Sequence, residues 1–179
     1  MREDGVMAVA RSAPAVRVAA ASDEAVLQRI DSEAWDDSSL FPSVRLRLAT
    51  SPFFTAEHPP EQHVVAELDR EVVGYARLVP ATPLPESQHV LAINGIAVDP
   101  RARARGVGKA LLAAAYEQAR DRGASKLSLR VLATNTAARA LYGSVGFQIE
   151  GVLRGEFRIG DDDVDDIVMA RYLVGTDQR

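Results

Sequence analysis

A glycine-containing turn between an apolar strand and a long amphipathic helix constrains the fold of this chain more than any other feature. The strand is predicted over Gln88–Val98, and the helix is predicted from about Gly106 to Arg122. Glycines at such a helix start let the backbone approach a ligand, and the exposed N–H groups there favour an anion, most often a phosphate. A plain strand-to-helix turn on a basic surface is the alternative interpretation. The basic side chains around the turn are Arg101, Arg103, Arg105 and Lys109.

Spacing excludes the two commonest phosphate-binding loops. A P-loop requires G-x-x-x-x-G-K-[ST], but Arg103 stands at the first glycine position and Ala110 at the hydroxyl position. Without that hydroxyl the turn lacks a magnesium ligand, which argues against nucleotide hydrolysis. A dinucleotide fingerprint requires G-x-G-x-x-G, and its third glycine position is Leu111 here. Neither nucleotide motif is therefore present.

The composition removes several other classes of function. The 179 residues include no cysteine, which excludes disulfides, thiolate metal sites and a cysteine nucleophile, and only three histidines, His58, His63 and His89. The formal net charge of −4 disfavours a general nucleic-acid surface. No apolar run approaches the ~18 residues of a membrane span. We therefore expect a cytoplasmic protein without a metal and without a nucleic-acid or membrane partner.

The N-terminal part of the chain is expected to begin with a flexible arm. Residues 1–14 carry little apolar periodicity, and a signal peptide is rejected because Arg11 and Pro14 interrupt the short apolar stretch. Ser22 is predicted to cap a helix that reaches Trp35, and the stretch through Thr50 is predicted to be helical as well.

The remaining pattern predicts one mixed α/β domain over residues 15–175. The helix that follows the glycine turn is predicted to end at Arg122, because Gly123 suits the position just after a helix. The other predicted elements are a short strand at Ala15–Ala20, a hairpin of His63–Asp69 and Val72–Leu78, a strand at Lys126–Leu132, a short helix at Thr136–Ser144 and a closing hairpin of Phe147–Ile159 and Val164–Leu173, with proline-rich loops at Ser51–Pro60 and Pro80–Pro85.

Two segments together resemble the GNAT N-acetyltransferase superfamily. The first is R-x-x-G-x-G, starting at Arg103 and opening a helix directly after the strand that ends Ile96-Ala97-Val98-Asp99-Pro100. The second is Asn135–Phe147, which is similar to the family's N-x-x-A…L-Y-x-x-x-G-F segment at the usual distance. The resemblance extends from about Val64 to Leu173, and its tail is similar to members that acetylate ribosomal proteins or small molecules.

The resemblance implies a fold and a cofactor. It implies a mainly antiparallel sheet of about seven strands, splayed in the middle and flanked by about four helices. The splay would separate the strand that ends at Val98 from Lys126–Leu132, and Asn94-Gly95 would carry a bulge. Backbone groups would bind the pantetheine arm of acetyl-CoA, the turn would bind its pyrophosphate, and Gly108 would leave space for the phosphate. The residues expected to bind the cofactor are Ile96, Ala97, Val98, Arg103, Ala104, Arg105, Gly106, Val107, Gly108, Lys109, Asn135 and Tyr142.

The same resemblance assigns chemistry to Tyr142. Acetyl transfer leaves a thiolate, and a nearby phenol protonates it as general acid. The alternative is that Tyr142 is a packing aromatic on a short helix. Asn135 either orients the cofactor or caps its helix, and Phe147 is expected in the core.

The general base is not assigned by the resemblance. Two positions where relatives carry a glutamate are Ala92 and Arg130 here. Asn94, which points the same way as Ala92 if the strand is regular, is expected to hold a catalytic water. The other candidates for the base are Glu67, His89 and the acidic run Asp161–Asp166.

The function implied by the resemblance is transfer of an acetyl group from acetyl-CoA to a primary amine by direct attack in a ternary complex. The acceptor is a small molecule or a protein N-terminus, and a homodimer is a further expectation. The alternative from another class is a non-catalytic acyl-CoA sensor on the same fold. A metal-dependent hydrolase is disfavoured because metal ligands are scarce and unclustered in the sequence.

Overall fold

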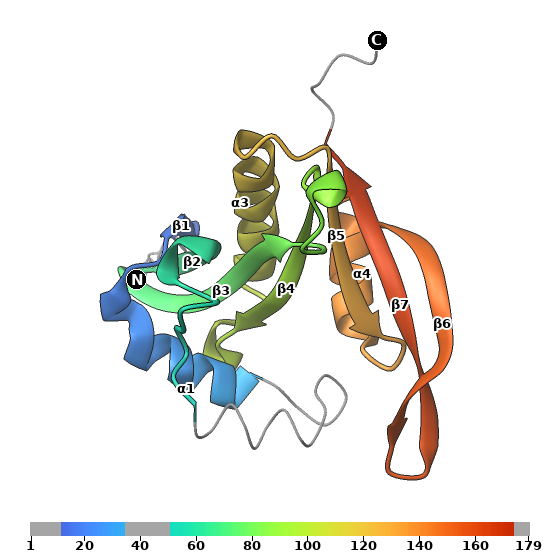
Figure 1. The fold of residues 1–179 in the computed structure, drawn as a ribbon. Coiled ribbons are helices and arrows are strands. Elements are labelled where there is room, and N and C mark those ends of the chain that lie inside the picture. Colours follow the sequence, from blue (N-terminus) through green and yellow to red (C-terminus); the bar gives the residue numbers. More distant parts are fainter. Residues whose placement is uncertain (1–11, 35–50, 174–179) are drawn as a thin grey trace, which may run out of the picture.

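A computed structural model describes residues 12–34 and 51–173 (Figure 1). Most of the predicted arm and the predicted helix through Thr50 lie outside the described residues. Seven strands form one sheet in the order β1-β2-β3-β4-β5-β7-β6. All neighbours are antiparallel except β4 and β5, which are parallel. The strands are β1 (Ala15–Val18), β2 (His63–Leu68), β3 (Glu71–Pro80), β4 (Val90–Val98), β5 (Lys126–Leu132), β6 (Gln148–Ile159) and β7 (Asp162–Tyr172). The fold class predicted from the sequence is confirmed.

Three α-helices lie within the described part of the chain, and the fourth predicted helix falls outside it. They are α1 (Glu24–Ala34), α3 (Val107–Asp121) and α4 (Thr136–Ser144). None of the described helices is long and apolar enough to cross a membrane. The predicted bounds of α3 and α4 are confirmed to within about one residue, and Gly123 has the positive φ of 78° that a helix C-terminus requires.

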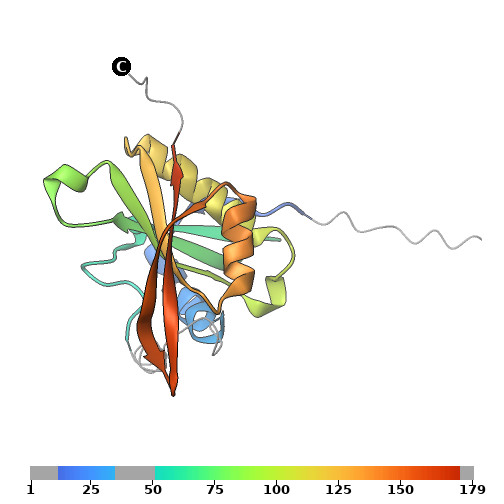
Figure 2. The same ribbon diagram turned by 90° about the vertical axis from the view of Figure 1, so that its right-hand side faces the viewer.

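Alternation along β2 distributes the core between the two faces of the sheet. Val64 and Ala66 pack in one apolar cluster with residues of α3, whereas Val65 packs in another with residues of α1. Because successive side chains of a strand point to opposite faces, α1 and α3 cover opposite faces of this half of the sheet. The hairpin of β6 and β7 forms the edge beyond β5, nearest the viewer in Figure 2.

The start of α1 differs from the sequence prediction. Ser22 does not cap the helix, because residues Ala21–Asp23 form a 3-10 turn and α1 begins at Glu24. The capping acceptor is instead the carboxylate of Asp23, which receives the backbone N–H of Ala20 at 2.8 Å. Arg17 on β1 donates two hydrogen bonds to the same carboxylate, at 2.7 and 2.9 Å, so a charge pair fixes the entry into α1.

The sheet opens between β4 and β5. Their parallel pairing covers only Val90–Ile93 against Lys126–Leu129, and the strands then diverge (Figure 1). On the other side of β4 the register with β3 shifts where Asn94 and Gly95 lie, because Leu78 pairs with Ile93 but Ala76 pairs with Ile96. The extra residue is a β-bulge, and Gly95 takes a φ of 125° that favours glycine there. The predicted splay and bulge are both confirmed.

Candidate active site

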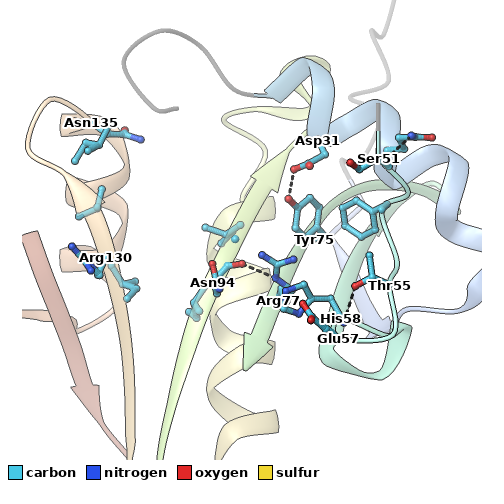
Figure 3. A pocket seen from close by; sticks show the side chains of 18 of the residues that line it. Asp31, Ser51, Thr55, Glu57, His58, Tyr75, Arg77, Asn94, Arg130 and Asn135 are labelled. Atoms are coloured by element: carbon cyan, nitrogen blue, oxygen red, sulfur yellow. Dashed lines mark hydrogen bonds between the residues drawn. The ribbon is translucent and has the colours of Figure 1, made fainter. Parts of the chain in front are cut away.

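A cavity of about 650 Å³ occupies the opening between β4 and β5 (Figure 3). One wall is formed by α1, residues 51–58 and β3, and the facing wall by β5, α4, β6 and β7. The polar and charged side chains on the first wall include Gln28, Asp31, Glu57, His58, Tyr75 and Arg77. Those on the facing wall include Arg130, Asn135, Tyr142 and Asp166. The cavity therefore brings together residues that lie more than a hundred positions apart in the chain.

The exposed edge of β4 forms the base of this cavity. The N–H of Asp99 donates to the carbonyl of Val73 at 2.8 Å, so the odd-numbered positions at this end of β4 direct their backbone groups to β3. The N–H and C=O groups of Ile96 and Val98 consequently point toward the opening, where β5 no longer pairs with them. Ala97, which the sequence grouped with them, directs its backbone groups toward β3. An extended amide chain placed in the opening can pair with this edge as an added strand.

The glycine turn lies beyond the end of β4. Ala104 and Gly106 have φ values of 58° and 82°, and α3 starts at Val107. The first intrahelical hydrogen bond runs from the N–H of Ala110 to the carbonyl of Gly106, so the N–H groups of residues 107–109 have no partner within the helix. A Cβ at Gly106 would meet nothing within 4 Å. The turn thus presents open space and a row of backbone donors that fit a phosphate group.

The basic side chains near the turn have structural partners of their own. Arg103 donates to the carbonyl of Ala34 at 2.6 Å, and Arg105 lies 3.8 Å from the carboxylate of Asp69. Lys109 is exposed on the first turn of α3. Arg103, one of the basic residues expected to hold the cofactor, thus links the turn to the end of α1.

Gly108 lies close to α4. A Cβ on Gly108 would lie 2.9 Å from Cδ2 of Leu141, which belongs to α4. The glycine therefore leaves room for the tip of the Leu141 side chain. The space for a phosphate that the sequence analysis expects at Gly108 stays a prediction.

Tyr142 is buried, with 6% of its surface exposed, and lines the cavity from α4. Its ring packs near that of Phe147, a core residue as predicted, with centroids 6.0 Å apart. Burial raises the pKa of Tyr142 to about 12, so the hydroxyl keeps its proton at neutral pH. Asn135 caps α4, because its side chain accepts the N–H of Ala138 at 3.0 Å, and it also lines the cavity.

The structure shows which of the candidates for a general base line the cavity. Glu67 pairs with Arg17 at 2.7 Å and does not line the cavity, and exposed His89 does not line it either. Of the acidic run, only Asp166 lines the cavity, where it is buried and paired with Arg130. Asn94 lines the cavity, and its backbone carbonyl accepts a hydrogen bond from Arg77 at 2.7 Å.

One pair of residues in the cavity was missed by the sequence analysis. The hydroxyl of Tyr75, on β3, donates a hydrogen bond to the carboxylate of Asp31, on α1 (Figure 3). Both side chains are buried, with 4% and 7% of their surface exposed. The signal in the sequence is an acid within the apolar stripe of α1, since Leu27, Ile30, Asp31 and Ala34 are its buried residues. No group of three or more potential metal ligands occurs in the part of the chain that the structure describes.

The chain matches the acetyltransferase (GNAT) family over residues 26–147 and belongs to that family. It is 41% identical over 75 residues to the ribosomal protein bS18-alanine N-acetyltransferase of Escherichia coli K12. The matched residues make up 42% of this chain and 51% of that protein. The chain thus spans about half the length of the curated relatives it matches.

Solved structures show the same fold. A GCN5-related N-acetyltransferase from Kribbella flavida is 28% identical, with a TM-score of 0.68 over 90% of this chain and 98% of that one. A phosphinothricin acetyltransferase from Sinorhizobium meliloti, solved in complex with acetyl-CoA, is 22% identical, with a TM-score of 0.72 over 90% of this chain and 89% of that one.

Proposed function

We propose that this protein transfers the acetyl group of acetyl-CoA to an amine, and that both substrates meet in the cavity between β4 and β5. The observation that carries the proposal is the incomplete pairing of these strands beyond Ile93 and Leu129. A continuous sheet would leave no unpaired backbone groups at its centre, whereas this one exposes those of Ile96 and Val98. Tyr142 lines this cavity from one wall, and Asp31 and Glu57 line it from the other.

The residues present fit acetyl-CoA. The edge of Ile96 and Val98 suits the amide groups of a pantetheine arm, which pair with backbone as a strand does. The donors of residues 107–109 and the open space at Gly106 suit its pyrophosphate. Acetyl-CoA, when bound, supplies an acetyl group activated as a thioester.

Tyr142 acts as the general acid in this proposal. As the neutral amine nitrogen bonds to the carbonyl carbon and the carbon–sulfur bond breaks, the hydroxyl of Tyr142 gives its proton to the sulfur. The nitrogen loses one proton to solvent, and Tyr142 regains one from solvent, so a free amine and acetyl-CoA yield an amide and free CoA. The high pKa of Tyr142 keeps that proton in place beforehand. A thiolate formed beside the buried Tyr142 also has its pKa raised by desolvation, which helps it to take the proton. No cysteine is present for a covalent acyl-enzyme, which favours direct attack in a ternary complex.

The acceptor belongs to the class of primary amines. The related Escherichia coli protein is named as an N-acetyltransferase of an alanine of ribosomal protein bS18. An α-amino group also suits this site because its pKa of about 7.7–8.0 leaves a sizeable free-amine fraction at neutral pH.

Cofactor binding and turnover test the proposal separately. Acetyl-CoA is expected to raise Tm, since a ligand at a hundredfold excess over Kd stabilises the folded state by about 2.7 kcal/mol, whereas NAD and ATP are expected to leave Tm unchanged. Release of free thiol is then followed with three probes: the amide of trialanine, phenethylamine and putrescine. A Tm shift with acetyl-CoA but no thiol release with any probe would favour the acyl-CoA sensor. An equal shift with ATP would contradict the proposed cofactor.

A further inference from the structure

We propose that the ring of Phe53 forms an apolar subsite for the acceptor, and that the preferred acceptor is a primary amine with an aromatic group close to its nitrogen. This inference rests on the proposed acetyltransferase function and names the chemistry of its second substrate. The ring and the cavity surface in front of it are called the Phe53 subsite below.

Phe53 lies next to the residue that touches the bulge of β4. Phe53 lines the cavity, and its ring meets that of Tyr75 edge-on, with centroids 4.8 Å apart. A Cβ at Gly95 would lie 3.7 Å from the hydroxyl of Tyr75, so Tyr75 reaches the strand just before the edge proposed to bind acetyl-CoA. An amine at this edge can therefore carry an aromatic group to Phe53 on a short tether. We call this wall, on which Figure 3 labels Tyr75 and Asp31, the acceptor side of the cavity.

Hydrogen bonds and ring contacts hold Phe53 in place before any acceptor binds. The backbone N–H groups of Phe53 and Phe54 donate to the two carboxylate oxygens of Glu24, at 2.7 and 3.0 Å, which ties this segment to α1. The Phe53 ring also contacts those of Phe54 and His63, with centroids 5.1 and 5.2 Å away. The ring is half-buried, so part of its surface is available to the cavity. A rigid ring of this kind loses little conformational entropy when a ligand binds.

Apolar side chains from other elements continue this surface. Ile93 and Ile96 line the cavity from β4, Leu132 lines it from β5, and Phe157 lines it from β6. Burial of an apolar group against such side chains is favourable in proportion to the area removed from water. An aromatic acceptor therefore gains binding energy from both walls of the cavity.

The competing acceptor class is a diamine, whose second ammonium group would pair with a carboxylate on the acceptor side. Asp31 already accepts the hydrogen bond of Tyr75, and Glu57 is exposed, so water weakens its attraction for a cation. Contact with Phe53 would also remove water from the second ammonium group, which is unfavourable. The acceptor side therefore favours an apolar group over a second charge.

The test compares two peptide amides that differ only in their first side chain, phenylalanyl-alanyl-alanine amide and trialanine amide. We expect wild type to have a kcat/KM about 10–200-fold higher for the phenylalanyl peptide, the discrimination that a hydrophobic pocket usually achieves. Phe53→Ala is expected to lower this ratio by about tenfold or more. Any difference in basicity between the two peptides cancels, because each enzyme is tested with the same pair.

Phe54 provides the matched control. Its backbone N–H shares the Glu24 carboxylate with that of Phe53, and its ring also contacts His63, but it does not line the cavity. Phe54→Ala is expected to lower Tm as Phe53→Ala does, yet to leave the peptide ratio within about threefold of wild type. The acetyl-CoA-induced Tm shift verifies folding. If Phe53→Ala does not fold, Phe53→Leu is used, with a smaller decrease in the ratio that still exceeds that of Phe54→Ala.

Phenethylamine distinguishes the two sources of an aromatic amine, because it carries the same ring at the same distance from its nitrogen without a peptide. Turnover of phenethylamine as efficient as that of the phenylalanyl peptide would assign the Phe53 subsite to small arylalkyl amines. Turnover of the peptide alone would assign it to the first side chain of a protein N-terminus. Either result supports the Phe53 subsite, whereas a preference for putrescine over both aromatic acceptors would contradict it.

A binding measurement separates this inference from the proposed function. Calorimetric titration of each aromatic acceptor into the CoA-bound protein requires no turnover, and Phe53→Ala is expected to raise Kd by about tenfold. A wild-type peptide ratio within about threefold of one, or equal changes of the ratio in Phe53→Ala and Phe54→Ala, would contradict the Phe53 subsite. Binding that depends on Phe53 without turnover of any acceptor would support the subsite and contradict the proposed acetyl transfer.

Discussion

The guanidinium of Arg29, on α1, donates a hydrogen bond of 2.9 Å to the carboxylate of Asp99, which follows the last residue of β4. Arg101 donates to the same carboxylate from its backbone and its side chain. Together with the bond from Arg103 to the carbonyl of Ala34, these contacts join α1 to the loop that leads into the glycine turn. The cavity wall that α1 forms and the turn proposed to hold the pyrophosphate thus share one set of contacts.

Asp99→Asn is expected to destabilise the fold by about 1.5–3 kcal/mol, the usual contribution of hydrogen bonds to a charged group. Asp99 is 2% exposed, and its hydrogen bonds from Arg101 and then Arg29 hold its pKa well below the usual range. Its stabilising contribution is therefore full above the unfolded pKa of about 3.9 and is lost as the pH falls toward the folded value. Urea unfolding measures the change. Glu33→Gln, which removes only the surface partner of Arg29, serves as control; equal losses in both variants would contradict the role of Asp99.

Tyr142→Phe is expected to lower kcat by about 10²–10⁴-fold, the usual contribution of a positioned general acid. The ring and its packing against Phe147 are retained, so Kd for acetyl-CoA and Tm should change little. Steady-state kinetics and calorimetric titration provide the two values. A kcat within threefold of wild type would return Tyr142 to a packing role.

Gly108→Val tests the reason for the glycine. The new side chain would displace the tip of the half-buried Leu141 side chain, and such a shift is expected to cost about 1 kcal/mol, the low end of the usual range for overpacking. Leu141→Ala in the same chain should restore both Tm and acetyl-CoA binding, because it opens the space that the valine requires. If the double variant regains its Tm but not its affinity, the position instead serves the phosphate, as the sequence first suggested.

His63 is expected to make the fold sensitive to acid. It is fully buried against Phe53 and Phe54, and burial lowers its pKa to about 4. The unfolded chain binds a proton near pH 6.5, so stability is full above that value and decreases by up to about 3 kcal/mol as the pH falls toward 4. Urea unfolding at pH 7 and pH 5 measures this loss. His63→Gln should reduce the difference between the two pH values, and an unchanged difference would assign it to other groups.

Local patterns predicted most of the fold. The apolar periodicity and the helix-ending glycine set the limits of α3, and Asn135 marked the start of α4 through its capping side chain. The bulge at Asn94-Gly95 was expected from the family resemblance. The residues that determine where these helices begin and end lie close to those ends in the sequence.

The acceptor side of the cavity could not be predicted in the same way. Asp31 and Tyr75 are 44 positions apart and meet only because α1 packs on the face of β3 that Tyr75 occupies. The contact of Gly108 with Leu141 could not be predicted either, because it depends on how α3 and α4 pack. Glu67 was considered as a base, but strand pairing places it beside Arg17 instead. These relationships are set by tertiary packing, which periodicity does not encode.

The most direct test of acetyl transfer in this cavity follows an isotopic label in the acetyl group of acetyl-CoA. Wild type, the trialanine amide and labelled acetyl-CoA are mixed, and mass spectrometry measures labelled amide while a thiol reagent measures free CoA. The account predicts that label and thiol appear in equal amounts, that initial-rate plots for the two substrates intersect, and that Tyr142→Phe slows both products alike. Tight binding of acetyl-CoA without labelled product from trialanine amide, phenethylamine or putrescine would contradict it.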